Sequence, residues 1–144
     1  MLIRDHRGYS MTFWAVFIGL VLVPIFAISI ELGRYFYAIA EIQKAADAAA
    51  VASSAEINPQ IFQDTGNLVP SDKAWGVAQT YVTFNTRGLS EKGVHAFVTG
   101  IAMDEGQDTV QVNVSADLSL LFPSVVPKVL VTQMGEAKMR SFTH

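Results

Sequence analysis

The chain has 144 residues and a formal net charge of −3, so it has room for a membrane segment and one small domain. Hydrophobic residues make up 51% of the sequence and charged residues 16%, a balance shifted from that of soluble domains towards membrane or assembly proteins. The lysines and arginines form no basic block, which excludes a nucleic-acid surface, and the absence of cysteine excludes disulfides and thiolate metal sites.

The segment from Met11 to Ile30 carries no charge and is long enough to cross a membrane as one helix. A helix rises ~1.5 Å per residue, so about 20 residues cover the ~30 Å hydrocarbon core. Residues 1–10 precede it as a short basic leader, in which Arg4 and Arg7 predict a cytoplasmic N-terminus and the rest of the chain outside. A cleaved secretory signal is the alternative, but its apolar region is normally shorter, about 7–15 residues.

Good helix formers continue without a break after the span, so we expect one helix from about Ser10 to about Ala55. Residues 31–56 of this helix form an alanine-rich stem outside the membrane. Pro24 should bend the span, because its ring removes one helical hydrogen bond.

Charged residues of the stem recur at helical spacing and can pair on one surface. A small and apolar stripe occupies the opposite surface. The predicted pairs are Glu31 with Arg34, Glu41 with Lys44 and Lys44 with Asp47, and the stripe is Ile39, Ile42, Ala46, Ala49 and Ser53.

Residues 57–144 are predicted to form a small head. Asn58-Pro59 and residues 64–67 favour turns and predict a linker at its start. A short helix is expected over residues 74–85, with Ser71 near its N-cap. Its expected buried face is Trp75, Ala78, Val82 and Leu89.

Three strands are predicted in the rest of the head, over residues 93–103, 109–118 and 129–140. The middle one alternates apolar and polar residues, which is typical of a half-buried antiparallel strand. Residues 104–107 suit a hairpin turn, and two prolines make residues 121–128 a connection. The predicted fold class is therefore α+β: a long N-terminal transmembrane helix that continues as a stem, then a head with a short helix and a three-stranded antiparallel sheet.

Three short patterns follow one another in a fixed order. Arg7-Gly8 precedes the span, Ile30-Glu31-Leu32-Gly33-Arg34 ends it, and residues 42–52 read IQKAADAAAVA. In this order and spacing the chain resembles the TadE/TadG-like proteins of tight-adherence (Flp-type) pilus assembly. The resemblance implies a pilin-like subunit or assembly factor, anchored in the bacterial inner membrane with its head outside. Its partners would be copies of itself, other pilus-assembly subunits and the lipid bilayer.

The leader also resembles that of type IV prepilins, which is short, charged and ends in glycine. Those proteins carry a glutamate a few residues into the mature helix, whereas no acid occurs here between Gly8 and Glu31. Processing after Gly8 is therefore an open alternative at this point.

Small side chains on the stem let a neighbouring helix approach closely, which suits helix bundling in a filament. The alternative is that the chain's own head covers this stretch, and the two can hold together. Bulk at this surface should then hurt assembly while the helix itself stays intact. The predicted helix–helix assembly surface is Ala38, Ala45, Ala46, Ala49 and Ala52.

Glu31 and Arg34 lie at the outer end of the span, where long side chains usually reach the headgroup layer. In an assembled bundle the same pair would be withdrawn from water and would fix the axial register between subunits, because an unpaired charge there is costly.

The sequence shows no metal-ligand spacing, no Ser/His/Asp arrangement and no glycine-rich phosphate loop. We therefore expect no enzyme, no cofactor and no small-molecule substrate. The functional alternative is a membrane-tethered monomeric binding or adhesin module with the stem as a spacer. A filament subunit associates with copies of itself, whereas the tethered module stays monomeric, so self-association distinguishes the two functions.

Overall fold

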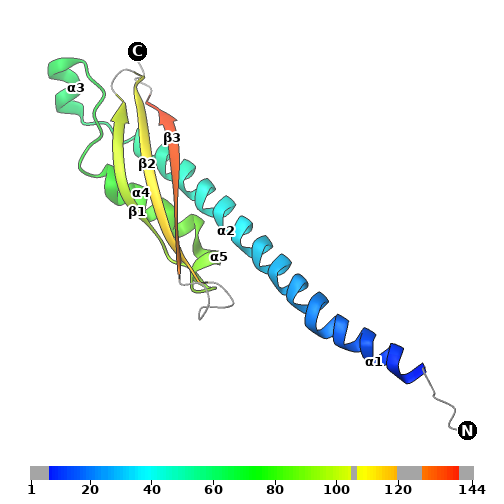
Figure 1. Ribbon diagram of the computed structural model, residues 1–144. Helices are drawn as coiled ribbons and strands as arrows, with labels where there is room; N and C mark the ends of the chain where they lie inside the picture. Colours follow the sequence, from blue (N-terminus) through cyan, green and yellow to red (C-terminus); the bar gives the residue numbers. More distant parts are fainter. Residues whose placement is uncertain (1–6, 105–106, 120–127, 140–144) are drawn as a thin grey trace, which may run out of the picture. The chain divides into compact units, whose positions relative to one another are not determined.

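The computed structural model describes residues 7–104, 107–119 and 128–139 (Figure 1). The chain divides into two compact units, Met1–Phe36 and Tyr37–His144. Some of the sequence predictions fall on residues outside the described ones. They are residues 1–6 of the leader with Arg4, the centre of the hairpin turn at 105–106, most of the connection at 121–128, and residue 140.

The first unit is helical throughout its described part. It contains α1 (Arg7–Phe17), a π-helical segment η1 (Ile18–Leu22) and the beginning of α2 (Val23–Ser54). The predicted long N-terminal helix is therefore confirmed, with a change of hydrogen-bond spacing inside it. In η1 the Val23 N–H bonds to the Ile18 carbonyl five residues back, directly before Pro24, which has no N–H to give.

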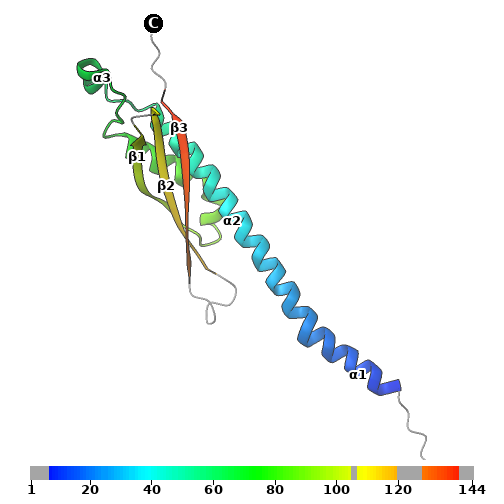
Figure 2. The same cartoon turned by 45° about the horizontal axis from the view of Figure 1, so that its top comes forward.

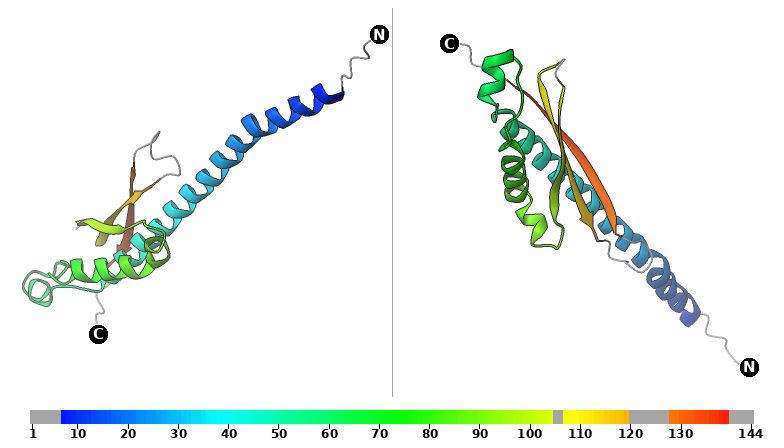
Figure 3. Two further views of the ribbon diagram at one scale, coloured as in Figure 1. Left: turned by 90° about the horizontal axis from the view of Figure 1, so that it is seen from below. Right: turned by 90° about the vertical axis from the view of Figure 1, so that its left-hand side faces the viewer.

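The second unit packs helices against one face of an antiparallel sheet, as Figures 2 and 3 show. Its strands β1 (Ala96–Asp104), β2 (Thr109–Leu118) and β3 (Val129–Lys138) lie in the order β1-β2-β3. The helices of this unit are the rest of α2, α3 (Pro59–Thr65), α4 (Ala74–Asn85) and α5 (Arg87–Ser90), of which α3 buries none of its residues. This confirms the predicted fold class, a long apolar helix followed by a small head with a three-stranded sheet.

The middle strand β2 supplies the centre of the core. Its bounds agree with the prediction, and its predicted inward side chains are buried, because alternate residues of a strand face the same side. The facing helices bury a 3,4-spaced stripe against them. The buried apolar side chains of these elements include Ile42, Ala78, Val82, Val110, Val112, Val114, Ala116 and Leu118.

Helix α4 has the predicted bounds, but one residue of its predicted buried face is wrong. Ala74, Ala78 and Val82 follow one another at four-residue spacing and are buried, whereas Trp75 is 48% exposed. One residue corresponds to about 100° around a helix, so Trp75 lies well off this stripe. The N-cap residue is Lys73, and the Ser71 hydroxyl accepts a hydrogen bond from its N–H at 3.3 Å.

The predicted linker contains a helix, α3, that the sequence interpretation missed. Asn58 is its N-cap and accepts hydrogen bonds from the N–H groups of Gln60 and Ile61 at 3.0 and 3.2 Å. Pro59 is its first residue and Gly66 ends it at φ 73°. Asn, Pro and Gly favour turns, but in this order they are also typical of a helix start and stop.

Candidate assembly surfaces

The first candidate surface is the apolar helix of the first unit. The helical run Ser10–Ser54 contains an 18-residue window of mean hydropathy 2.6, none of which is buried, so it is long and apolar enough to cross a membrane. Large apolar side chains are exposed along it. They include Phe13, Val16, Leu20, Ile25, Phe26 and Ile28.

The alanine stripe of α2 lies in the second unit and is largely covered. Ala38, Ala45, Ala46 and Ala49 are buried in the chain's own head, and Ala52 is half-buried. The covered-stem alternative from the sequence therefore describes this structure. Leucine at Ala45 or Ala49 would therefore overpack the head as well, in addition to any effect on assembly.

A close approach between α2 and β3 explains why this part of α2 is made of small residues. A Cβ atom built on Gly135 would overlap the Ala46 carbonyl and the Asp47 nitrogen. Alanine and glycine therefore allow the helix backbone and the strand backbone to touch.

Gln43 makes a hydrogen bond between α2 and β3 close to this contact. Its side-chain amide donates to the Met134 carbonyl and to the Asp47 carboxylate, each at 2.9 Å. Gln43, Ala46 and Asp47 all belong to the IQKAADAAAVA pattern, so this pattern docks the sheet onto the helix. The sequence analysis missed the roles of Gln43 and Gly135. Glycine on the inward side of a predicted strand is the signal that could have revealed the contact.

Two predicted charge pairs are present, and the third is replaced. Arg34 contacts Glu31 at 3.2 Å and Lys44 contacts Glu41 at 2.7 Å. Asp47, predicted to pair with Lys44, instead accepts the hydrogen bond from Gln43. The hydrogen bond to Glu41 raises the pKa of the exposed Lys44 ammonium, which contributes little to stability because water screens the pair.

Helices α2 and α4–α5 are linked at two points of the second unit. The Ser53 hydroxyl donates to the Ala49 carbonyl at 2.7 Å and lies 3.4 Å from the Ala74 carbonyl at the start of α4. After α5, the Lys92 ammonium lies 5.2 Å from the centre of the Tyr37 ring, a cation–π arrangement. These contacts hold α2 against its own head.

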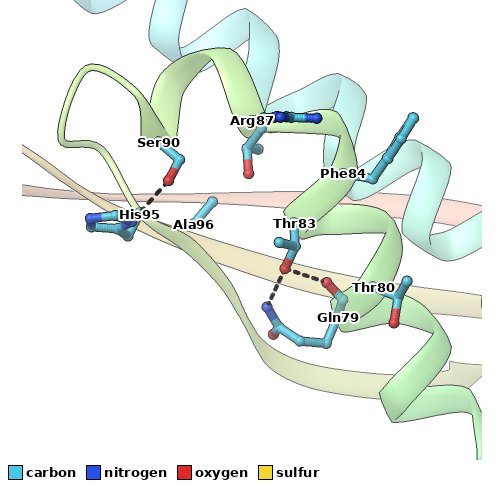
Figure 4. A pocket seen from close by; sticks show the side chains of 9 residues that line it. Gln79, Thr80, Thr83, Phe84, Arg87, Ser90, His95 and Ala96 are labelled. Atoms are coloured by element: carbon cyan, nitrogen blue, oxygen red, sulfur yellow. Dashed lines mark hydrogen bonds between the residues drawn. The ribbon is translucent and has the colours of Figure 1, made fainter.

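A surface hollow of about 660 Å³ lies beside α4, α5 and the start of β1 (Figure 4). The polar groups around it pair with one another, Ser90 with His95 at 3.2 Å and Gln79 with Thr83 at 3.3 Å. The Gln79 oxygen also accepts from the Val98 N–H at 2.9 Å. Within residues 7–104, 107–119 and 128–139, no cluster of His, Asp and Glu that could hold a metal ion is found.

Gly8, the possible processing site, lies in the first turn of α1. Together these features define a chain with a long apolar N-terminal helix and a small α+β head. Residues 8–56 match the Flp pilus-assembly family of TadE/G-like proteins. The N-terminal part of the chain is therefore similar to the TadE/G-like proteins, which confirms the resemblance read from the sequence. No curated protein and no solved structure matches the chain.

Proposed function

We propose that the chain is a structural, pilin-like subunit or an assembly factor of a Tad-type surface filament. The apolar helix would hold it in the bacterial inner membrane, with the N-terminus inside and the head outside. The observation that carries the proposal is the family match over residues 8–56, which covers both the apolar helix and the alanine-rich part of α2.

In this proposal the subunits associate through their N-terminal helices. The exposed apolar residues of α1 and η1 are the available surface, because most of the predicted alanine surface is occupied by the head. Ala52 keeps part of its surface exposed at the far end of α2 and can take part as well. Ala38, Ala45, Ala46 and Ala49 would contribute between subunits only where the head moves away from them.

Two further roles belong to the same proposal. In an assembled bundle the Glu31–Arg34 pair would be withdrawn from water at the membrane boundary. It would set the axial register between neighbouring helices, because a register that left either charge unpaired there would be costly. Cleavage after Gly8 would remove the short leader before assembly. The partners would be copies of this chain and other pilus-assembly subunits within the lipid bilayer, with no catalytic step.

The second candidate function is a membrane-tethered monomeric binding or adhesin module. The burial of the alanine stripe in the head favours it, because a covered stem does not need a neighbour. The hollow beside α4 and α5 would then be the place to look for a ligand.

Chemical crosslinking in native membranes, combined with analysis of sheared surface material, separates the two functions. The filament proposal expects crosslinked oligomers of this chain or its complexes with pilus subunits, and a loss of these products when exposed helix residues such as Leu20 are replaced by bulky polar ones. Only monomers in the membrane, with filaments that form normally without them, would refute the proposal and favour the tethered module.

A further inference from the structure

Two backbone carbonyls in η1 lack the donors that an α-helix would give them. The Val23 N–H bonds to the Ile18 carbonyl and therefore leaves the Gly19 carbonyl without its α-helical donor. The Leu20 carbonyl would be paired with the N–H of residue 24, which is proline and has none. Gly19 has no side chain, and nothing lies within 4 Å of the place where one would begin, so a neighbouring helix can come close to the backbone at this position.

These carbonyls lie near the middle of the predicted span, residues 11–30. Water does not reach the hydrocarbon core, so a carbonyl that lacks its helical donor there is stabilised when a neighbouring helix supplies one. Single π turns inside helices are also frequent at functional positions.

Trp14 offers the complementary group on the same helix. Its indole N–H can only donate, and the residue as a whole is 57% exposed. The Trp14 ring makes edge-on contacts with Phe13 and Phe17 at centroid distances of 6.3 and 5.8 Å. No other side chain between Trp14 and Ser29 can donate a hydrogen bond, and the Ser29 hydroxyl already donates to the Ile25 carbonyl at 2.9 Å.

We propose that a second copy of this chain docks in parallel, displaced along the helix axis, and places its Trp14 indole N–H on the carbonyls of Gly19 and Leu20, which lack their α-helical donors. Five to six residues separate donor and acceptor along the helix, so the displacement is about 8 Å at ~1.5 Å per residue. An in-register pair cannot make this contact, because the donor and the acceptors then lie at different depths.

The contact joins two different surfaces of the same chain, and each copy offers both. A head-to-tail contact of this kind repeats without closing on itself, as a filament requires. The inference rests on the proposed function and adds to it the bonding groups and the stagger.

Cysteine crosslinking can test the stagger, because the chain has no cysteine of its own. Chains carrying Val21→Cys and chains carrying Ala27→Cys are co-expressed at full length and oxidised in native membranes. Val21 lies seven residues after the donor Trp14, and Ala27 lies seven residues after the acceptor Leu20. One heptad on a helix returns to nearly the same face, so the two cysteines come together at the proposed displacement. We expect 21–27 disulfides to exceed 21–21 and 27–27 disulfides by at least about threefold, and a majority of in-register disulfides would overturn the inference.

Two substitutions test the bond itself. Trp14→Phe keeps a ring and removes the N–H, and Pro24→Ala restores an N–H for Leu20. Each should lower the 21–27 yield by about 3- to 30-fold, the range expected for one hydrogen bond between membrane helices. Phe26→Leu and Ile25→Ala are the matched controls and should leave it unchanged. An unchanged yield in Trp14→Phe and Pro24→Ala would overturn the inference. If the staggered disulfides are absent while the chain is still found in filaments or pilus complexes, only this inference fails and the proposed function stands.

Discussion

The side-chain amide of Gln43 donates to the carbonyl of Met134 at 2.9 Å, across 91 residues of sequence. Gln43 lies on α2 and Met134 on β3, so this bond joins the segment that matches the TadE/G-like family to strand β3 of the head. The same amide also donates to the Asp47 carboxylate, one helical turn further on, at 2.9 Å. The Gln43 side chain is therefore held by one partner on its own helix and one on the sheet.

Replacing Gln43 should therefore weaken the head. Gln43→Leu removes both hydrogen bonds and should lower the free energy of unfolding by about 1 kcal/mol, the usual net value of such a bond. Lys44→Gln, at the neighbouring exposed position, should change it by less than about 0.5 kcal/mol. Thermal unfolding of the full chain in detergent, followed by circular dichroism, measures both variants. Equal stabilities would contradict the role given to Gln43.

A methyl group at Gly135 should also be costly. Gly135→Ala places a Cβ against the backbone of Ala46, which cannot rotate away, and should destabilise the head by about 1–3 kcal/mol. The control is Gly76→Ala, where an added Cβ meets nothing within 4 Å. In the helical control alanine should stabilise by about 0.5–1 kcal/mol. Denaturant titration of both variants decides the point, and a Gly135→Ala protein as stable as wild type would show that the close contact does not exist.

The register of β2 makes a third prediction. Val112 is 0% exposed and faces the helices, whereas Leu130 on β3 is 61% exposed. Val112→Asp buries an unpaired carboxylate and should unfold the head, at a cost of several kcal/mol. Leu130→Asp introduces the same charge at the surface and should be tolerated. Limited proteolysis of the two variants is the measurement, and equal resistance would mean that the sheet is registered differently.

Much of this fold follows from local patterns. The bounds of α4 and β2 were predictable, because a helix and a strand each repeat their apolar residues with a characteristic period in the sequence. The two-residue period of β2 also predicted which of its side chains face inward. Trp75 was misplaced because a large aromatic residue favours burial, while the four-residue spacing of Ala74, Ala78 and Val82 decides the buried stripe. Helix α3 was missed because Asn58-Pro59 is equally typical of a turn and of a helix start.

The candidate surfaces were harder to predict than the fold. Small residues such as Ala46 suit both an intermolecular contact and an intramolecular one, and only the position of Gly135 opposite Ala46 shows which contact this structure makes. The Gln43–Met134 bond joins residues far apart in sequence, so no local pattern contains it. The π turn before Pro24 depends on how the helix redistributes a lost hydrogen bond, which the sequence alone predicts only as a bend.

Topology is open to a direct chemical test. The proposal puts the head outside the cytoplasm, and Glu91 on the head has a side chain that is 72% exposed. In this cysteine-free chain, Glu91→Cys should react with a membrane-impermeant maleimide in intact spheroplasts. Labelling that occurs only after lysis would place the head in the cytoplasm and reverse the proposed orientation.

The central claim is that the chain takes part in building a Tad-type filament, and filament counts in a deletion strain test it most directly. The gene is removed from the cells that make this protein, and surface filaments are counted by electron microscopy before and after the full chain is restored. The account predicts that filaments are lost, or much reduced in number or length, and return with the full chain. Filaments of normal number and length in the deletion strain would contradict it.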